Sequence, residues 1–283
     1  YELLTMPTYN WVANYIFINQ EDKKIDMKED PPIVLVIGGL DPTGGAGVLA
    51  DSQTILMNGC HPITLVTCLT AQNTNSFNGM KATNANFFKK MTKTLLKDIS
   101  SIRAIKIGAL ANEEIIKLVK EIIINYKNIP VVLDPIIETS SGGSLISKEG
   151  IKELKLSLLP YAELVTPNIE EAKFLTNKDS LSEITEQFHK LKSNYIFIKD
   201  NEEENQIRNY LYKNKQLIKE WQVAKIKGRF QGTGCSISSC IASNLAKEIK
   251  IEESIELAQD TVHQSLLSAI DLGKGQKIPK RII

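Results

Sequence analysis

A glycine-rich turn that carries a cysteine, Gln231-Gly-Thr-Gly-Cys235, stands directly before a helical pattern in which Ile237, Ile241 and Leu245 share one face. Because the first amides of a helix lack partners within it and its dipole is positive there, such a turn favours an anion, such as a phosphoryl group in transfer. The same field favours a thiolate, so we predict that the pKa of Cys235 lies below the usual value of about 8.5. A cysteine that only packs at a helix start is the alternative.

A second glycine-rich turn, residues 39–47, precedes a helical pattern in which Val48, Asp51 and Ile55 lie in one row. A carboxylate among core residues is costly unless a polar group binds it, so we expect a partner for Asp51. The turn lacks the acidic residue about 20 positions on that a dinucleotide fingerprint needs, and it lacks the lysine of a P-loop. By itself it therefore indicates little about the ligand.

Small and polar residues recur where short apolar runs end, at positions 38–39, 72–73, 108, 134 and 166–168. Ordinary turn chemistry could explain any one of them. Five in one chain favour a ligand site, because ligands of open parallel sheets bind at the carboxyl ends of the strands. Asn168 can cap the helix that follows it, and Glu171 could complete that cap or hold a magnesium–phosphate complex through water.

Alternating apolar strands and helical patterns from Ile33 onward predict an α/β fold, with a mostly parallel central sheet and helices on both faces. We expect strands at 33–37, 63–67, 104–107, 130–133, 164–165, 195–198, 208–212 and 216–224. We expect helices at 45–58, 87–99, 113–126, 148–157, 170–175, 181–191, 236–246 and 251–272, and a loop at 71–84. Residues 31–283 are predicted to form a single domain, preceded by an N-terminal arm at 1–30.

Composition excludes several classes of partner. Lysine plus arginine number 34 and aspartate plus glutamate 33, so the net charge of +1 favours neither nucleic acid nor an anionic membrane. No apolar run reaches the ~18 residues of a membrane span, and the start of the chain lacks a signal-peptide pattern. The cysteines show no CxxC spacing, which indicates a reducing, cytoplasmic compartment. Cys60, Cys68 and Cys240 are expected to be structural.

In this order, the motifs resemble the ribokinase superfamily and, within it, the hydroxymethylpyrimidine/phosphomethylpyrimidine kinases of thiamine biosynthesis. The resemblance spans about residues 33 to 272 and rests on the stretches 39–51, 69–74, 106–110, 131–135, 158–168 and 232–235. The Gly-Thr-Gly-Cys motif is the most specific, since most ribokinase-like sugar kinases carry an aspartate at the position of Cys235.

The resemblance implies an ATP- and Mg²⁺-dependent kinase that is often a homodimer. It would phosphorylate the hydroxymethyl group of 4-amino-5-hydroxymethyl-2-methylpyrimidine and then the resulting monophosphate. Cys235 would be the base, beside an anion hole of the Gly232, Thr233 and Gly234 amides. Asp51 and Gln72 would bond the aminopyrimidine. The other implied residues are Gly39, Ala46, Ala109 and Ile136 for the substrate, Asn168, Lys199 and Thr233 for ATP, and Asp134 and Glu171 for magnesium and phosphate.

Several positions depart from the pattern of this family. Asp200 and Asn201 replace glycines after Lys199, Gln231 replaces a histidine, and Ala109 replaces a bulky methionine, which would enlarge the pocket. A pyridoxal/pyridoxine kinase and a non-catalytic pyrimidine-binding relative are therefore alternatives. A nicotinamide-dependent dehydrogenase is disfavoured by the missing fingerprint acid.

Overall fold

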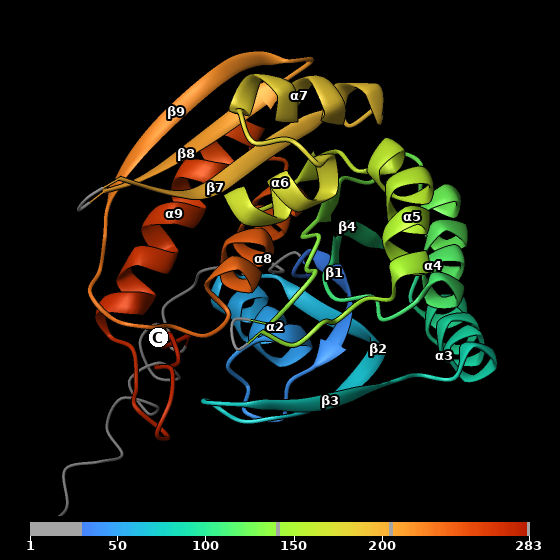
Figure 1. Ribbon diagram of the computed structural model, residues 1–283. Coiled ribbons are helices and arrows are strands. Elements are labelled where there is room, and N and C mark those ends of the chain that lie inside the picture. The colour runs from blue at the N-terminus through green and yellow to red at the C-terminus, as the bar shows by residue number, and fades with distance from the viewer. Residues whose placement is uncertain (1–29, 140–141, 204–205, 282–283) are drawn as a thin grey trace, which may run out of the picture. The chain divides into compact units, whose positions relative to one another are not determined.

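A nine-stranded sheet forms the centre of the protein (Figure 1). The structure, a computed structural model, describes residues 30–139, 142–203 and 206–281. The strand order is β3-β2-β1-β4-β5-β6-β7-β8-β9. The strands are β1 (Ile33–Leu40), β2 (His61–Gln72), β3 (Phe77–Ala82), β4 (Ile102–Ile107), β5 (Val131–Leu133), β6 (Leu164–Val165), β7 (Tyr195–Glu203), β8 (Gln206–Lys213) and β9 (Gln216–Ala224). The strands from β2 to β7 in this order pair in parallel, and β3, β8 and β9 pair antiparallel.

The two faces of the sheet carry separate hydrophobic cores, because neighbouring residues of a strand point to opposite faces. In β1, Leu35 and Ile37 enter one core and Val34 and Val36 the other. The first core is covered by α3 (Ala85–Asp98), α4 (Glu113–Asn125), α5 (Lys148–Ser157), α6 (Ile169–Thr176) and α7 (Leu181–Lys190). The second is covered by α2 (Gly47–Met57), α8 (Thr233–Ala246) and α9 (Ile251–Leu267). A 3₁₀ turn, η1 (Leu159–Tyr161), follows α5.

The predicted fold class is confirmed, but the prediction of a loop at 71–84 is wrong. Strand β2 continues to Gln72, and β3 pairs with it at the edge of the sheet. The sequence of β3 is Phe-Asn-Gly-Met-Lys-Ala, which lacks regular alternation and contains Gly79 at a φ of 126°. Backbone pairing to a long neighbour therefore forms this strand rather than an intrinsic preference of its residues.

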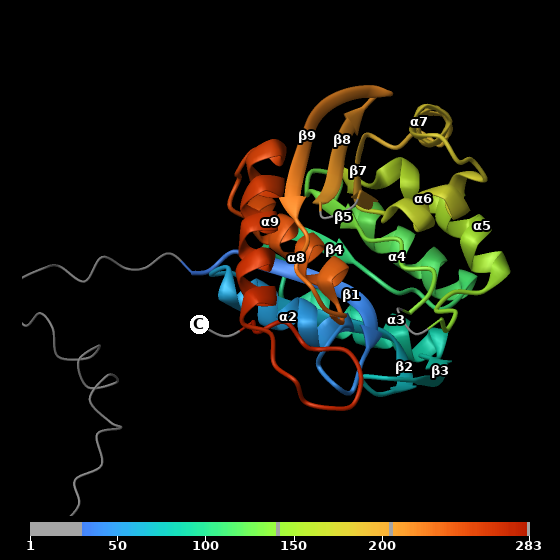
Figure 2. The ribbon, with the colours of Figure 1, turned by 60° about the vertical axis from the view of Figure 1, so that its left-hand side comes forward.

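The ends of the last two helices also differ from the prediction. Helix α8 begins at Thr233, within the glycine turn, rather than at Ser236. Helix α9 ends at Leu267 rather than at residue 272, because Ile270 pairs with Ile278 in an antiparallel bridge. The chain after α9 consequently turns back toward α2 and α8 (Figure 2).

Residues from Pro32 onward form one compact unit. The predicted arm at 1–30 lies, apart from Asp30, outside the described residues. Within the described ranges, no helix is both long and apolar enough to cross a membrane.

Candidate active site

A cavity of about 720 Å³ opens at the carboxyl ends of the parallel strands. Its floor includes the ends of β1 and β4, between which the strand order reverses, as expected for a ligand site in an open sheet. Every residue that the sequence placed in the site lines this cavity: Gly39, Ala46, Asp51, Gln72, Ala109, Asp134, Ile136, Asn168, Glu171, Lys199, Gly232, Thr233, Gly234 and Cys235.

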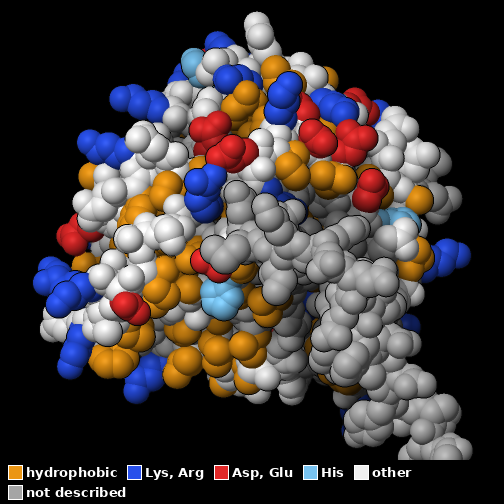
Figure 3. All heavy atoms as spheres, turned by 180° about the vertical axis from the view of Figure 1, so that it is seen from behind, with side chains coloured by type: hydrophobic (Ala, Val, Ile, Leu, Met, Phe, Trp, Pro, Cys, Tyr) orange, Lys and Arg blue, Asp and Glu red, His pale blue; other side chains and the backbone are white. Residues whose placement is uncertain are grey.

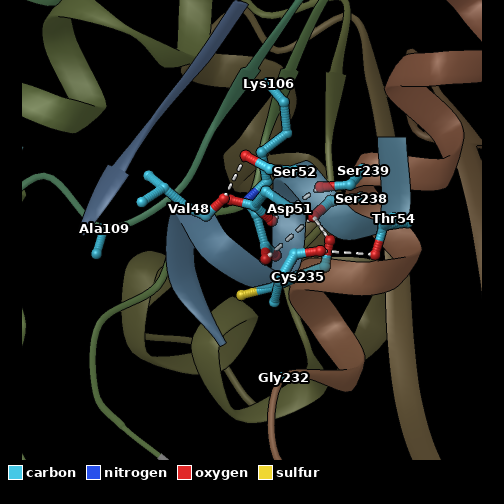
Figure 4. A network of polar contacts seen from close by, with 12 residues as sticks. Val48, Asp51, Ser52, Thr54, Lys106, Ala109, Gly232, Cys235, Ser238 and Ser239 are labelled. Atoms are coloured by element: carbon cyan, nitrogen blue, oxygen red, sulfur yellow. Dashed lines mark hydrogen bonds and ion pairs between the residues drawn. The ribbon is translucent and has the colours of Figure 1, made fainter. Parts of the chain in front are cut away.

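Asp51 has the polar partners that its place among core residues demands. Its Oδ2 accepts a hydrogen bond of 2.8 Å from the Nζ of Lys106, and its Oδ1 accepts one of 2.8 Å from the hydroxyl of Ser239 (Figure 4). The side chains of Asp51 and Lys106 are fully buried. Burial alone would lower the pKa of Lys106, but the attraction of the Asp51 and Asp134 carboxylates outweighs it and raises the pKa, so this lysine is charged.

Cys235 lies in the first turn of α8 with only 5% of its surface exposed. Burial raises the pKa of its thiol to about 11. The charge of Lys106 and the amide of Gly47 oppose this rise, whereas the carboxylates of Asp51 and Asp134 add to it. The prediction of a lowered pKa is therefore wrong. Desolvation at this helix start exceeds the stabilisation of a thiolate by the helix dipole, so the group is a thiol at neutral pH.

The two glycine turns lie against each other and form the wall around Cys235. Gly232 has a φ of 70°, and a Cβ at this position would lie 2.0 Å from the carbonyl oxygen of Gly45, so only glycine fits. The buried carboxylate of Asp41 accepts hydrogen bonds of 2.9 Å from the amide of Ala46 and 2.8 Å from the Nε2 of Gln231. One carboxylate thus connects both turns.

The amides at the start of α8 are placed to receive an anion. Helix α8 has Gly232 as its N-cap, and no side chain caps it, in contrast to α6, which Asn168 caps. The first amides of α8 therefore lack the partner that a capping side chain would supply, and they open on the cavity. The anion hole that the resemblance implied would lie at this helix start.

Asp134 is another buried carboxylate of the site. Its Oδ1 accepts hydrogen bonds of 2.8 Å from the Nζ of Lys199 and 3.0 Å from Thr166, and the Ser238 hydroxyl lies 3.3 Å from its Oδ2. Burial would raise its pKa, but Lys199 and Lys106 outweigh burial and lower it. Asp134 is thus ionised, and Lys199 stands beside the start of α8, where a Cβ on Gly234 would lie 2.9 Å from its Nζ.

Glu171 completes a capping box with Asn168. The Asn168 side chain accepts from the Glu171 amide at 2.7 Å, and Glu171 Oε2 accepts from the Asn168 amide at 2.9 Å. Capping was one of the two roles that the sequence left open, and Glu171 also lines the cavity. Across the described ranges, no three His, Cys, Asp or Glu residues are grouped as ligands of a metal ion. The carboxylates of Asp134 and Glu171 at the cavity fit a magnesium ion that would be held largely by substrate phosphates and water.

Sequence reasoning missed the contacts that Lys106 and Asp41 make in the site. A lysine inside the apolar strand Ile102–Ile107 is the same kind of signal that drew attention to Asp51, and it could have been found in the same way. No local sequence pattern indicates that Asp41 binds Gln231, because Asp41 lies 190 residues earlier in the chain. The side-chain oxygen of Gln231, Oε1, is a buried acceptor without a hydrogen-bond partner in the described part of the protein. The side chain of Asp200 lies outside the described structure.

A mostly parallel sheet carries an uncapped helix start, a charged lysine and buried carboxylates around one cavity, which are the parts that an α/β small-molecule kinase needs for phosphoryl transfer. The model of the phosphomethylpyrimidine kinase family matches residues 41–280, and the chain belongs to this family.

Relatives of known name agree with this assignment. The hydroxymethylpyrimidine/phosphomethylpyrimidine kinase of Aquifex aeolicus is 32% identical over 253 residues, which cover 87% of this chain and 98% of that protein. The protein of the same name from Staphylococcus aureus strain MSSA476 is 29% identical over 255 residues, which cover 87% of this chain and 92% of the relative.

Solved structures show the same ribokinase-like fold. The phosphomethylpyrimidine kinase of Clostridium difficile 630 superposes with a TM-score of 0.71 at 28% identity, covering 83% of this chain and 99% of that one. The pyridoxal kinase of Bacillus subtilis, solved as an ADP complex, has a TM-score of 0.80 at 24% identity and covers 89% of this chain and 98% of its own. At that identity, the second likeness concerns the fold alone.

Proposed function

We propose that this chain uses ATP to phosphorylate 4-amino-5-hydroxymethyl-2-methylpyrimidine and then its monophosphate in thiamine biosynthesis. One observation carries the proposal: Asp51, Gln72, Asp134 and Cys235 come from four separate segments and line a single cavity. The names of the relatives support the same substrate.

The substrate ring is proposed to lie over the ends of β1, β2 and β4. Gln72 ends β2 and is partly exposed, so its amide can donate to a ring nitrogen and accept from the amino group. Asp51 still has lone pairs beyond those used by Lys106 and Ser239, and it can accept from the amino group. A ring without this pattern would leave buried polar groups unpaired, which gives selectivity.

The phosphoryl group is proposed to lie between the start of α8 and Lys199. ATP supplies this group, and magnesium would neutralise part of its charge beside Asp134 and Glu171. The amides of Gly232, Thr233 and Gly234 stabilise the charge that develops on the transferred oxygens. Cys235 is a thiol before substrate binds, so it must first release its proton to water in order to act as the base. The thiolate then accepts the proton of the substrate hydroxyl as its oxygen attacks the phosphorus, which can come late in a loose transition state.

A direct assay tests the proposal. Purified protein with ATP, Mg²⁺ and the aminopyrimidine should form the monophosphate and then the diphosphate, followed by ³¹P NMR. Pyrimidine binding without any transfer of phosphate would contradict it and would indicate a non-catalytic relative. Formation of the monophosphate alone would limit the proposal to its first step.

The variant Cys235→Ser separates catalysis from binding. We expect kcat to fall by about 10²-fold or more, within the range of acid–base catalysis, because a serine hydroxyl loses its proton far less readily than a thiol and so rarely forms the anion that acts as base. The pyrimidine dissociation constant, measured by calorimetry, should change little. Unchanged turnover would exclude Cys235 as the base.

Pyridoxal is a second candidate substrate, favoured by one observation. Ala109 lines the cavity where a bulkier residue would narrow it. Rates on pyridoxal and on the aminopyrimidine should be compared in wild type and in Ala109→Met. If pyridoxal is a substrate, the larger side chain should lower its kcat/KM more than that of the pyrimidine.

We also propose that the protein is a cytoplasmic, Mg²⁺-dependent homodimer. Large apolar side chains are exposed on α2 and β2, including Leu49, Leu56 and Leu69, and one face of the molecule shows gathered hydrophobic side chains (Figure 3). Light scattering at micromolar concentration tests the dimer, and a monomer there would contradict it. Activity after treatment with EDTA, with and without added Mg²⁺, tests the metal.

A further inference from the structure

The guanidinium of Arg281 connects the two glycine turns of the site. Its Nη1 donates to the carbonyl of Gly44 at 3.1 Å, and its Nη2 donates to that of Gly45 at 2.8 Å. Nη2 also lies 3.5 Å from the carbonyl of Gln231 and 3.4 Å from that of Gly232. One side chain therefore contacts the backbone on both sides of the junction between the turns.

The third nitrogen of Arg281 reaches the helix that carries Cys235. Nε donates to the hydroxyl of Ser236 at 2.8 Å, and this hydroxyl in turn lies 3.0 Å from the carbonyl of Gly232. The planar fork of an arginine can serve several acceptors in fixed directions at once, which a lysine cannot do. The contacts of Arg281 thus fix the peptide planes of the turn whose amides face the cavity.

The backbone brings Arg281 to this position. After α9, Lys277 forms a parallel bridge with Phe230: its amide donates to Arg229, and its carbonyl accepts from the Gln231 amide at 3.0 Å. The segment is therefore held against the residues that directly precede the anion hole. Arg281 follows four residues later with 3% of its surface exposed.

The charge of Arg281 has no carboxylate in contact. In the described ranges, its hydrogen bonds go to backbone carbonyls and one hydroxyl, and no Asp or Glu pairs with it. Asp41 and Asp51 attract this charge from beyond contact distance, but burial outweighs them and lowers the pKa of Arg281. An anion bound nearby would therefore stabilise the buried cation further. A bound phosphoryl group at the start of α8 would be such an anion.

We propose that Arg281 is a positioning residue for phosphoryl transfer, which holds the two glycine turns together and leaves positive charge behind the anion hole. The inference rests on the proposed kinase function. It concerns a residue near the end of the sequence that touches neither the reacting atoms nor the pyrimidine.

Two variants test the proposal. Arg281→Gln removes the charge and the fork, and we expect kcat to fall by up to about a hundredfold, because a small misplacement of catalytic groups has effects of this size. Binding of a nonhydrolysable ATP analogue should weaken, while the pyrimidine dissociation constant should stay close to that of wild type. Arg281→Lys keeps the charge but loses the planar fork of the guanidinium, and its kcat should lie between those of wild type and Arg281→Gln.

A matched control is Arg103→Gln, which removes an exposed arginine that pairs with Glu248 on the surface. It should have wild-type kcat. All rates are expressed per folded protein, as measured by thermal unfolding. If folded Arg281→Gln retains wild-type kcat and analogue binding, the proposal is wrong. If that variant does not fold, wild-type kcat in Arg281→Lys would also refute it. Wild-type protein that transfers no phosphate would refute the proposed function instead.

Discussion

Burial decides the chemistry of the reactive groups. Cys235 stands at a helix start, where the dipole favours a thiolate, and yet its pKa is raised to about 11 because the thiol is almost completely removed from water. Lys106 is also buried, but carboxylates surround it and it stays charged. Which partners a side chain meets matters more here than the element on which it lies.

The raised pKa of Cys235 predicts slow alkylation that increases steeply with pH. At pH 8, the thiolate fraction is on the order of 10²-fold below that of an ordinary cysteine, and the greater nucleophilicity of a basic thiolate recovers only part of this. Iodoacetamide labelling of Cys235, followed by mass spectrometry of its peptide, should still accelerate between about pH 9 and 11. A plateau near pH 9 would show that the pKa is not raised.

The buried pair of Asp51 and Lys106 predicts a large loss of stability when one partner is neutralised. Asp51→Asn leaves Lys106 with a weaker partner, and we expect the free energy of unfolding in urea to fall by about 3–5 kcal/mol. Arg103→Gln, which breaks an exposed pair, should change it by about 1 kcal/mol at most. Equal effects of the two substitutions would contradict the buried pair.

Helix α8 depends on a close contact at its first residue. The turn before it approaches the Gly45 carbonyl so closely that a side chain at Gly232 has no space. Gly59, at the end of α2, has a similar φ of 73°, but a Cβ there would meet nothing within 4 Å. An alanine at Gly59 would therefore add only the strain of the left-handed conformation, whereas an alanine at Gly232 would add both that strain and a collision with Gly45.

The comparison of Gly232→Ala with Gly59→Ala tests this contact. Gly59→Ala should cost about 1–2 kcal/mol of stability, through the left-handed conformation alone, and should leave kcat unchanged. Gly232→Ala should cost more and should also lower kcat, because the first turn of α8 has to move away from Gly45. Denaturation midpoints measure the loss of stability, and initial rates measure the change in kcat. Similar stability losses with unchanged rates would argue against a tight junction.

The sequence predicted most elements because their apolar residues repeat with the period of a strand or a helix. The residues that it assigned to the site line one cavity, since the carboxyl ends of parallel strands converge. It did not predict β3, whose pairing depends on its neighbour, or the contacts of Gln231 with Asp41 and of Arg281 with Gly45. Those join residues about 190 and 236 positions apart, and no local pattern marks such pairs.

The whole molecule holds four buried thiols, which predicts a loss of stability in alkali. The pKa values of Cys60 and Cys68 are raised, and those of Cys235 and Cys240 reach about 11 and 12, with burial as the main cause. The folded state therefore prefers the protonated thiols. This contribution is complete below the unfolded pKa of about 8.5 and is lost as pH rises through the folded values.

The free energy of unfolding should therefore fall from about pH 8.5 toward pH 11, as measured in guanidinium chloride at each pH. Each thiol contributes a slope of up to about 1.4 kcal/mol per pH unit. Cys240→Ala should start from a lower stability at neutral pH, because it leaves a cavity, but should lose less between these limits. If the free energy of unfolding falls with pH equally in the variant and the wild type, Cys240 does not contribute to the loss of stability in alkali.

The bridge made by Arg281 also has a consequence for folding during translation, because the ribosome synthesises the residues of the site in a fixed order. Strands β1 and β4 and the buried pair of Asp51 and Lys106 come from the first half of the sequence and can assemble early. The bridge that Arg281 makes between the two glycine turns needs a residue that emerges some 46 positions after Cys235. A nascent chain that does not yet include Arg281 could form the sheet and the floor of the cavity, but the Arg281 contacts at the proposed phosphate site would still be missing. Competence to turn over substrate should therefore appear late and abruptly during translation.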